Sequence, residues 1–202
     1  MGLVALAALL AVACGDGESR TDEPVEPRAR VWVGELADTD AKVGFVHSGD
    51  EAVLFLCGGE ASYPELTRWF SGTTALEGPF SFEAPGFRVE GELRDDVLEG
   101  TVRRSEEDEN AWSAAPVAAD TLAGLYSGEA PCGRVGLIVS QTDADDEPTG
   151  QGACVTFADG QFNVEQVNPV LPLRLADEVL RVIVASDPDR EITVRPLAAT
   201  AF

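Results

Sequence analysis

The only histidine of the chain lies in a short polar segment, His47-Ser48-Gly49-Asp50, which contains a base, a hydroxyl group and a carboxylate. A nucleophilic triad uses these residue types, but it gathers them from separate elements so that the side chains line up. Neighbouring polar residues around a glycine are typical of a turn. We therefore predict a hairpin turn here and no catalytic site.

A second polar segment places four carboxylates within five positions, at Asp143, Asp145, Asp146 and Glu147. Calcium prefers such oxygen ligands on a loop. The spacing differs from that of an EF-hand loop, which needs a glycine at its sixth position and a glutamate at its twelfth. We interpret the segment as a solvated loop tip, and calcium is the one cofactor that these residues would fit.

Arg68, Trp69 and Phe70 form a candidate binding segment between Pro64 and Gly72. Adjacent residues on a strand face opposite sides, so both aromatic side chains are buried only if the strand is covered on both faces. Otherwise one of them is exposed, and Trp and Arg often dominate binding surfaces. The sequence leaves both alternatives open.

The charge of the chain excludes several classes of function. There are 36 acidic and 14 basic residues, with a formal net charge of -22, and only one lysine and one histidine. A phosphate polymer needs a basic surface, so nucleic acid is not an expected partner. The hydrolase, metalloprotease and nucleotide-binding motifs with recognisable spacing are absent from the sequence, so we predict that the protein is not an enzyme.

The N-terminus contains an unbroken apolar run over residues 2–13, which ends in Ala11-Val12-Ala13 and is followed by Cys14. The run is too short to span a membrane as a helix. It resembles a bacterial lipoprotein signal, in which small residues precede the cysteine that becomes lipidated. The resemblance implies a signal peptide over 1–13, a diacylglycerol on Cys14, and attachment to a membrane of the bacterial cell envelope, facing the periplasm or the cell surface. Residues 14–29 are polar and are predicted to form a flexible tether.

Lipidation of Cys14 leaves Cys57, Cys132 and Cys154, an odd number that allows one disulfide and one free thiol, or an intermolecular bond. Closeness in sequence favours Cys132 with Cys154. A simple hairpin, however, would place these two at opposite ends of adjacent strands. Cys57 is then a buried free thiol within an apolar strand.

From Arg30 onward the apolar residues follow a period of two, in short runs separated by turn residues. This pattern predicts an all-β fold, an antiparallel barrel or sandwich of roughly a dozen short strands. The hairpin formed by 87–94 and 97–103 is the clearest case. The other predicted strands cover residues 31–36, 42–47, 52–57, 67–71, 80–83, 124–128, 134–140, 153–157, 161–167, 171–175, 179–185 and 191–196.

The domain, residues 30–202, contains a weak internal repeat that would divide it into halves at 30–118 and 119–202. The segment 31–46 resembles 125–138, each is followed by a cysteine-bearing strand, and 80–83 resembles 162–165. These similarities predict two related β-meanders. The segment between the halves is either a linker or a long hairpin turn followed by an edge strand that carries Trp112, and we favour the second.

These observations predict an acidic, envelope-anchored lipoprotein that acts as a non-catalytic module binding a ligand or an envelope protein. The alternatives are a carboxylate-dependent glycan hydrolase and a mainly structural envelope protein. An aromatic-lined cavity with two carboxylates about 5 to 10 Å apart would favour the hydrolase. Barrels filled with side chains would favour the other two.

Overall fold

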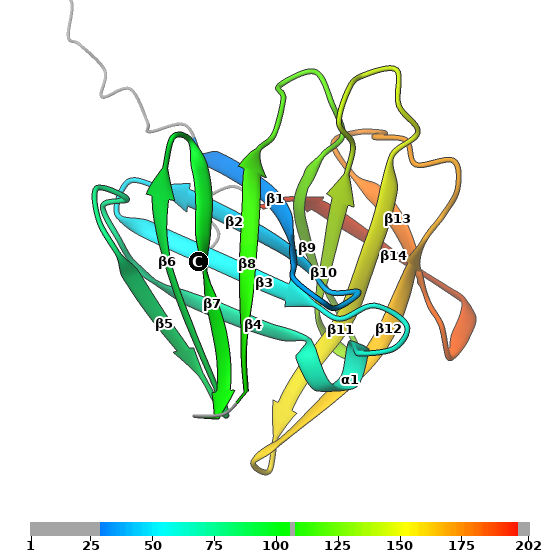
Figure 1. The fold of residues 1–202 in the computed structure, drawn as a ribbon. Coiled ribbons are helices and arrows are strands. Elements are labelled where there is room, and N and C mark those ends of the chain that lie inside the picture. Colours follow the sequence, from blue (N-terminus) through cyan, green and yellow to red (C-terminus); the bar gives the residue numbers. More distant parts are fainter. Residues whose placement is uncertain (1–28, 106–107, 198–202) are drawn as a thin grey trace, which may run out of the picture.

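The structure is a computed structural model that describes residues 29–105 and 108–197, and nearly all of its regular elements are antiparallel strands (Figure 1). The all-β prediction is confirmed. The elements are β1 (Arg30–Leu36), β2 (Lys42–Ser48), β3 (Glu51–Cys57), α1 (Tyr63–Leu66), β4 (Arg68–Thr73), β5 (Phe80–Ala84), β6 (Phe87–Arg94), β7 (Val97–Ser105), β8 (Asp108–Pro116), β9 (Gly124–Ala130), β10 (Gly133–Ser140), β11 (Thr149–Ala158), β12 (Gln161–Pro169), β13 (Leu180–Val184) and β14 (Asp187–Pro196).

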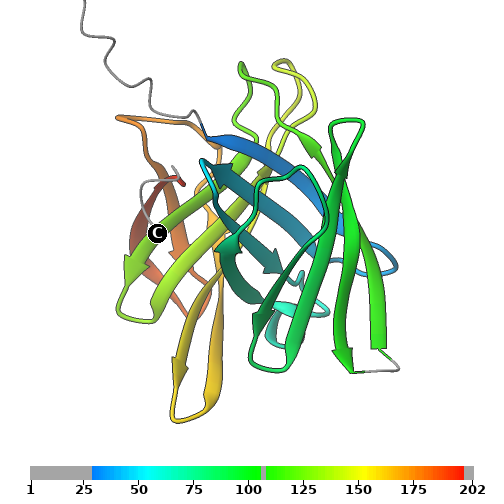
Figure 2. The same cartoon turned by 90° about the vertical axis from the view of Figure 1, so that its left-hand side faces the viewer.

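The strands form two sheets that lie side by side (Figure 1, Figure 2). The first sheet has eight strands in the order β4-β3-β2-β1-β8-β7-β6-β5, and the second is a closed barrel of six in the order β10-β11-β12-β13-β14-β9. The eight-stranded sheet curls until its edges approach. A Cβ atom added to Gly72 on β4 would lie 2.5 Å from the ring of Phe82 on β5.

The first strand of each sheet pairs with the last strand of the same sheet, β1 with β8 and β9 with β14. The prediction that Trp112 lies on an edge strand is therefore wrong, because β8 lies between β7 and β1. The predicted repeat agrees with the structure over the first three strands of each half. It is wrong for 80–83 and 162–165, which lie on the fifth strand of one sheet and the fourth of the other.

The predicted strand at 171–175 is also wrong, because these residues form a loop. Pro172 has no N–H group to donate to a neighbouring strand. Leu173 packs into the core of the barrel, whereas Leu171 and Leu175 are exposed. The loop ends in a tight turn closed by two backbone hydrogen bonds between Ala176 and Val179.

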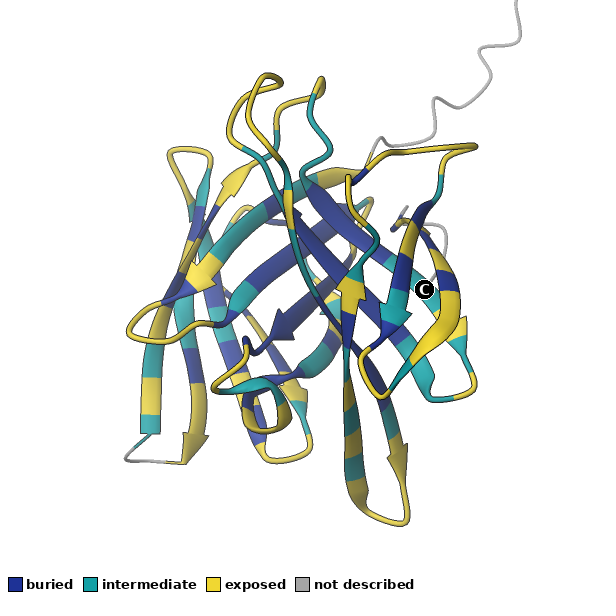
Figure 3. Ribbon diagram, turned by 90° about the vertical axis from the view of Figure 1, so that its right-hand side faces the viewer, coloured by how far each residue is buried: buried dark blue, intermediate teal, exposed yellow. Residues whose placement is uncertain are grey.

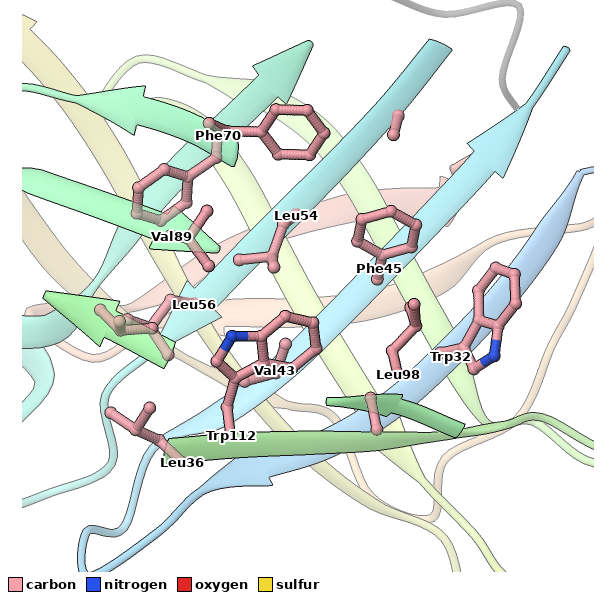
Figure 4. Packing of buried hydrophobic residues seen from close by; sticks show 14 of the residues in the cluster. Trp32, Leu36, Val43, Phe45, Leu54, Leu56, Phe70, Val89, Leu98 and Trp112 are labelled. Carbon is pink, nitrogen blue, oxygen red and sulfur yellow. The ribbon is translucent and has the colours of Figure 1, made fainter. Parts of the chain in front are cut away.

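Buried residues follow the strands of both sheets, and exposed residues gather at the hairpin tips and loops (Figure 3). The first sheet encloses a core rich in aromatic rings, including Trp32, Phe45, Phe70 and Trp112 (Figure 4). The two indoles of this core have partners within the fold: Trp32 Nε1 donates to Asp96 O over 2.9 Å, and Trp112 Nε1 donates to Glu90 O over 3.1 Å. The Nε1 atom of Trp69 is also buried, but it has no hydrogen-bond partner among the described residues. The barrel encloses a separate aliphatic core.

A third apolar cluster lies between the two sheets. It joins the outer faces of β2 and β3 to residues of β9, β10 and β11, among them Val53 and Phe55 on one side and Leu125 and Ile138 on the other. As a result β2 and β3 are buried on both faces. This two-sided burial explains why residues 53–57 form a continuous apolar run instead of alternating.

Gly136 on β10 sits where the two sheets come closest. A Cβ atom at this position would lie 2.5 Å from the ring of Phe55 and 2.6 Å from the ring of Trp69. Real Cβ atoms do not approach rings this closely, so any larger residue would force the sheets apart.

We expect Gly136→Ala to lower the free energy of unfolding by about 1 to 3 kcal/mol, the usual cost of overpacking a core. Equilibrium denaturation in urea measures this difference. Gly78→Ala is the matched control, because a Cβ atom at Gly78 meets no atom within 4 Å. Equal effects of the two substitutions would contradict the close contact at Gly136.

Candidate functional site

The polar segment at His47 forms the hairpin turn between β2 and β3, as predicted. The Nε2 atom of His47 lies 2.7 Å from Thr74 O, and the backbone N–H of Thr74 donates to Asp50 O. These bonds tie the turn to the chain that follows β4. The imidazole is thus engaged with a backbone carbonyl at the rim of the first sheet.

The predicted binding residues on β4 are covered on both faces of the strand, which decides between the two alternatives left open by the sequence. Phe70 is buried in the core of the first sheet. Trp69 faces the second sheet. Its ring stacks on that of Phe55 on β3, with 4.2 Å between the ring centroids, and the guanidinium carbon of Arg134 on β10 lies 3.9 Å from the Trp69 centroid. Trp69 therefore belongs to the contact between the sheets, and Phe70 belongs to the core of the first sheet.

Arg68 is held between two rings at the same junction. Its guanidinium carbon lies 4.7 Å from the ring centroid of Phe87 and 4.0 Å from that of Phe162 on β12. Loss of water around the side chains lowers the pKa of Arg68 and of Arg134. Stacking on aromatic rings compensates part of this desolvation, so both arginines serve as inter-sheet contacts.

The four carboxylates proposed as calcium ligands lie on the exposed loop between β10 and β11. The loop is closed by its own hydrogen bonds: Asp146 Oδ2 accepts the N–H of Asp143, and the amide of Gln141 donates to the carbonyls of Ala144 and Asp146. Within the ranges 29–105 and 108–197, no group of three or more His, Cys, Asp or Glu residues is placed to hold a metal ion. Asp143, Asp145, Asp146 and Glu147 do not converge on one point.

Cys132 and Cys154 form a disulfide, with their Cα atoms 6.0 Å apart. A simple hairpin was expected to place the two cysteines at opposite ends of adjacent strands. The structure differs because β11 begins at Thr149, earlier than predicted. Cys154 therefore pairs with Val135, close to the start of β10 and to Cys132. Cys57 is a free, buried thiol, and desolvation raises its pKa to about 12. A thiol with this pKa is neither a nucleophile nor a metal ligand at neutral pH.

Two adjoining hollows on the outer face of the first sheet form the most extended candidate site. One, of about 570 Å³, lies over β5, β6 and β7, and the other, of about 400 Å³, lies over β1, β7 and β8. They share Glu99 and Gly100. We call the two hollows together the acidic groove, because its lining includes Glu35, Glu90, Glu92 and Glu99.

The carboxylates of the acidic groove differ in their partners. Glu90 pairs with Arg88 at 2.8 Å, Glu92 pairs with Arg94, and Glu35 pairs with the single lysine, Lys42. No cationic side chain in the part of the chain that the structure describes pairs with Glu99.

Glu99 lies directly opposite Glu92 in the register of β6 and β7. Like charges at facing positions on neighbouring strands destabilise a sheet. The centre of the acidic groove therefore carries an excess of negative charge that a bound cation would offset.

Sequence reasoning identified these glutamates only as the solvated face of the hairpin 87–103. Gly91 and Gly100 lie opposite each other in this hairpin, at positions in phase with the buried residues of their strands. A Cβ atom at Gly91 would lie 2.7 Å from the rings of Phe80 and Trp112, so this glycine makes room for the aromatic core beneath the groove. That Glu35 also lines the groove could not be predicted from the sequence, because it depends on the pairing of β1 with β8.

The two aromatic residues that line the acidic groove, Phe80 and Trp112, are only 7% and 2% exposed. Their rings point into the core of the first sheet, so they offer no platform on which a sugar ring stacks. The groove is thus a polar surface over the filled core of the first sheet, and Arg88 and Arg94 line it together with the four glutamates.

The fold and the groove define an all-β protein of two packed antiparallel sheets with an acidic outer surface. The sequence matches no protein-family model, and comparison with curated proteins and with solved structures found no significant match. Among residues 29–105 and 108–197, no helix has the length and apolar character needed to cross a membrane.

We expect the thiol of Cys57 to resist alkylation in the folded protein. In a Cys14→Ala variant kept non-reduced at pH 8, iodoacetamide should label Cys57 only after denaturant is added, because the thiolate that reacts is almost absent at a pKa of about 12. Peptide mapping should recover Cys132 and Cys154 as a linked pair. Labelling of native Cys57, or a crosslink that contains it, would contradict this assignment.

Proposed function

We propose that the protein is a non-catalytic binding module of the bacterial cell envelope, anchored by a lipid on Cys14, and that its acidic groove binds a cationic partner. Cys14 and residues 1–28 lie outside the described residues, so the anchor rests on the resemblance of Ala11-Val12-Ala13-Cys14 to a lipoprotein signal. The partner class is a basic segment of an envelope protein or a ligand with cationic groups.

The observation that carries the proposal is the facing pair Glu92 and Glu99 at the centre of the groove. Arg94 neutralises Glu92, while Glu99 lacks a cationic partner among the described side chains. A guanidinium or ammonium group placed between the two carboxylates relieves their repulsion and gains charge-assisted hydrogen bonds. The net charge of -22 also accelerates the approach of a positively charged partner.

The filled interior supports a binding role over hydrolysis. Two-carboxylate glycan hydrolysis needs an acid and a second carboxylate on either side of a bound sugar. The groove is open and presents no aromatic face, and the cores of both sheets are packed with apolar side chains. No particular observation favours the hydrolase, and a purely structural role is an outcome of the binding test.

We expect an arginine-rich hexapeptide to bind the protein, and Glu92→Gln/Glu99→Gln to weaken that binding by about fivefold, because two exposed ion pairs contribute about 1 kcal/mol together. Isothermal titration calorimetry at low and physiological salt measures the change. Asp145→Asn/Glu147→Gln is the matched control, because it removes the same charge from an exposed loop. Equal losses in the two variants would show that only the net charge attracts the peptide.

We expect Cys14→Ala to move the protein from the detergent phase to the aqueous phase when bacteria that express it are extracted with a phase-separating detergent. Acyl chains contribute about 0.8 kcal/mol for each buried CH₂ group, so their loss removes the anchor. Mass spectrometry of the wild-type N-terminal peptide should show the lipid on Cys14. Identical partition of wild type and variant would rule out lipid anchoring.

A further inference from the structure

The loop between β12 and β13 exposes more apolar surface than its surroundings. Leu171 is 68% exposed and Leu175 is 44% exposed, and together with Phe157 they are the large hydrophobic side chains that the described residues leave in solvent. Leu173 between them is buried and fixes the loop to the barrel core. The loop is therefore an anchored feature that presents leucines outward.

A pocket of about 340 Å³ lies under this loop. Its apolar walls come from Val170, Leu171, Pro172, Ala176 and Val179. The backbone N–H of Val170 donates to Arg181 O, and the tight turn between Ala176 and Val179 closes the far side. The volume falls in the range typical of small-molecule sites.

Arg174 and Arg181 supply the charged part of the lining, and no carboxylate lines the pocket. This is unusual in a chain with 36 acidic residues. The acidic residues of the adjacent turn, Asp177 and Glu178, are exposed and lie outside the lining.

The two arginines are available to a ligand. No carboxylate within 29–105 or 108–197 pairs with Arg174. Arg181 touches Glu191 at 3.3 Å in an exposed pair, an interaction of small net strength.

We propose that this pocket binds a single-chain anionic amphiphile, a molecule with a carboxylate head and an alkyl chain. The guanidinium groups bind the head through paired, charge-assisted hydrogen bonds. The alkyl chain lies along the apolar walls and covers the exposed Leu171, which removes apolar surface from water. The pocket lies on the second sheet, apart from the acidic groove, and gives the proposed binding module an anionic ligand in addition to its cationic partner.

Decanoate below its micelle concentration is the probe, and calorimetry of the full chain measures its binding. We expect Arg174→Gln to weaken decanoate binding by about tenfold or more, because a charge-assisted bond is lost. Arg190→Gln removes the same charge on β14, outside the pocket lining, and should leave the affinity unchanged. Each methylene removed from the probe should weaken binding by about fourfold, and Leu171→Ser should weaken it as well.

Four outcomes would overturn the proposal: no decanoate binding at millimolar concentration, equal effects of Arg174→Gln and Arg190→Gln, no effect of Leu171→Ser, or equally tight binding of decyltrimethylammonium. Binding of anionic vesicles that depends on Arg174 and Leu171, without decanoate binding, would instead assign the loop to a membrane surface and would also overturn it. Failure of this test leaves the arginine-peptide and lipidation results intact, so it is distinguishable from failure of the proposed function.

Discussion

The packing of the outer faces of β2 and β3 against β9, β10 and β11 is the contact on which both sheets depend. It buries Phe55 and Val53 on one side and Ile138 and Leu125 on the other, and it requires that position 136 be glycine. Without it each sheet would expose a contiguous apolar patch, which proteins rarely leave in water. Gln151 reinforces the same contact, because its amide donates to the backbone carbonyls of Cys57 and Asp40 on the first sheet. The two sheets are thus held together by the buried apolar cluster between them and by the hydrogen bonds that Gln151 makes beside it.

The distribution of charge follows from that contact. A carboxylate at the dry contact between the sheets would lose its water without gaining a partner, so the acidic residues of this chain, whose net charge is -22, lie elsewhere. The arginines that do lie at this contact stack on aromatic rings: Arg68 on Phe87 and Phe162, and Arg134 on Trp69. Aromatic faces attract a cation without introducing a second charge that would itself need water. The acidic residues are therefore distributed over the outer surface, where salt and solvent screen their repulsion. The facing pair Glu92 and Glu99 in the acidic groove is one place where this arrangement leaves like charges close together.

Strand positions could be predicted from the sequence because apolar and polar side chains alternate along a half-buried strand. The hairpin at 87–103 was located to within two residues. The sequence did not predict which strands close each sheet, because the pairing of β1 with β8 and of β9 with β14 joins residues far apart in the chain. The same limit concealed Glu35 as part of the groove and misplaced β8 at an edge. At 171–175 the apolar spacing resembled a strand, but Pro172 removes a donor and only Leu173 faces the core. Pairing of Cys132 with Cys154 was accessible because it needs only local geometry around β10 and β11.

The number of strands decides where a ligand can bind. Closed or nearly closed sheets of six and eight strands have interiors just wide enough for side chains to fill, and here aromatic rings fill one and aliphatic side chains the other. Any partner must therefore use the outer faces and the loops. On the first sheet the outer face carries the glutamates of the groove because apolar and charged residues alternate along the hairpin strands. On the second sheet the irregular chain after β12 places Arg174 and apolar walls beside Arg181 of β13.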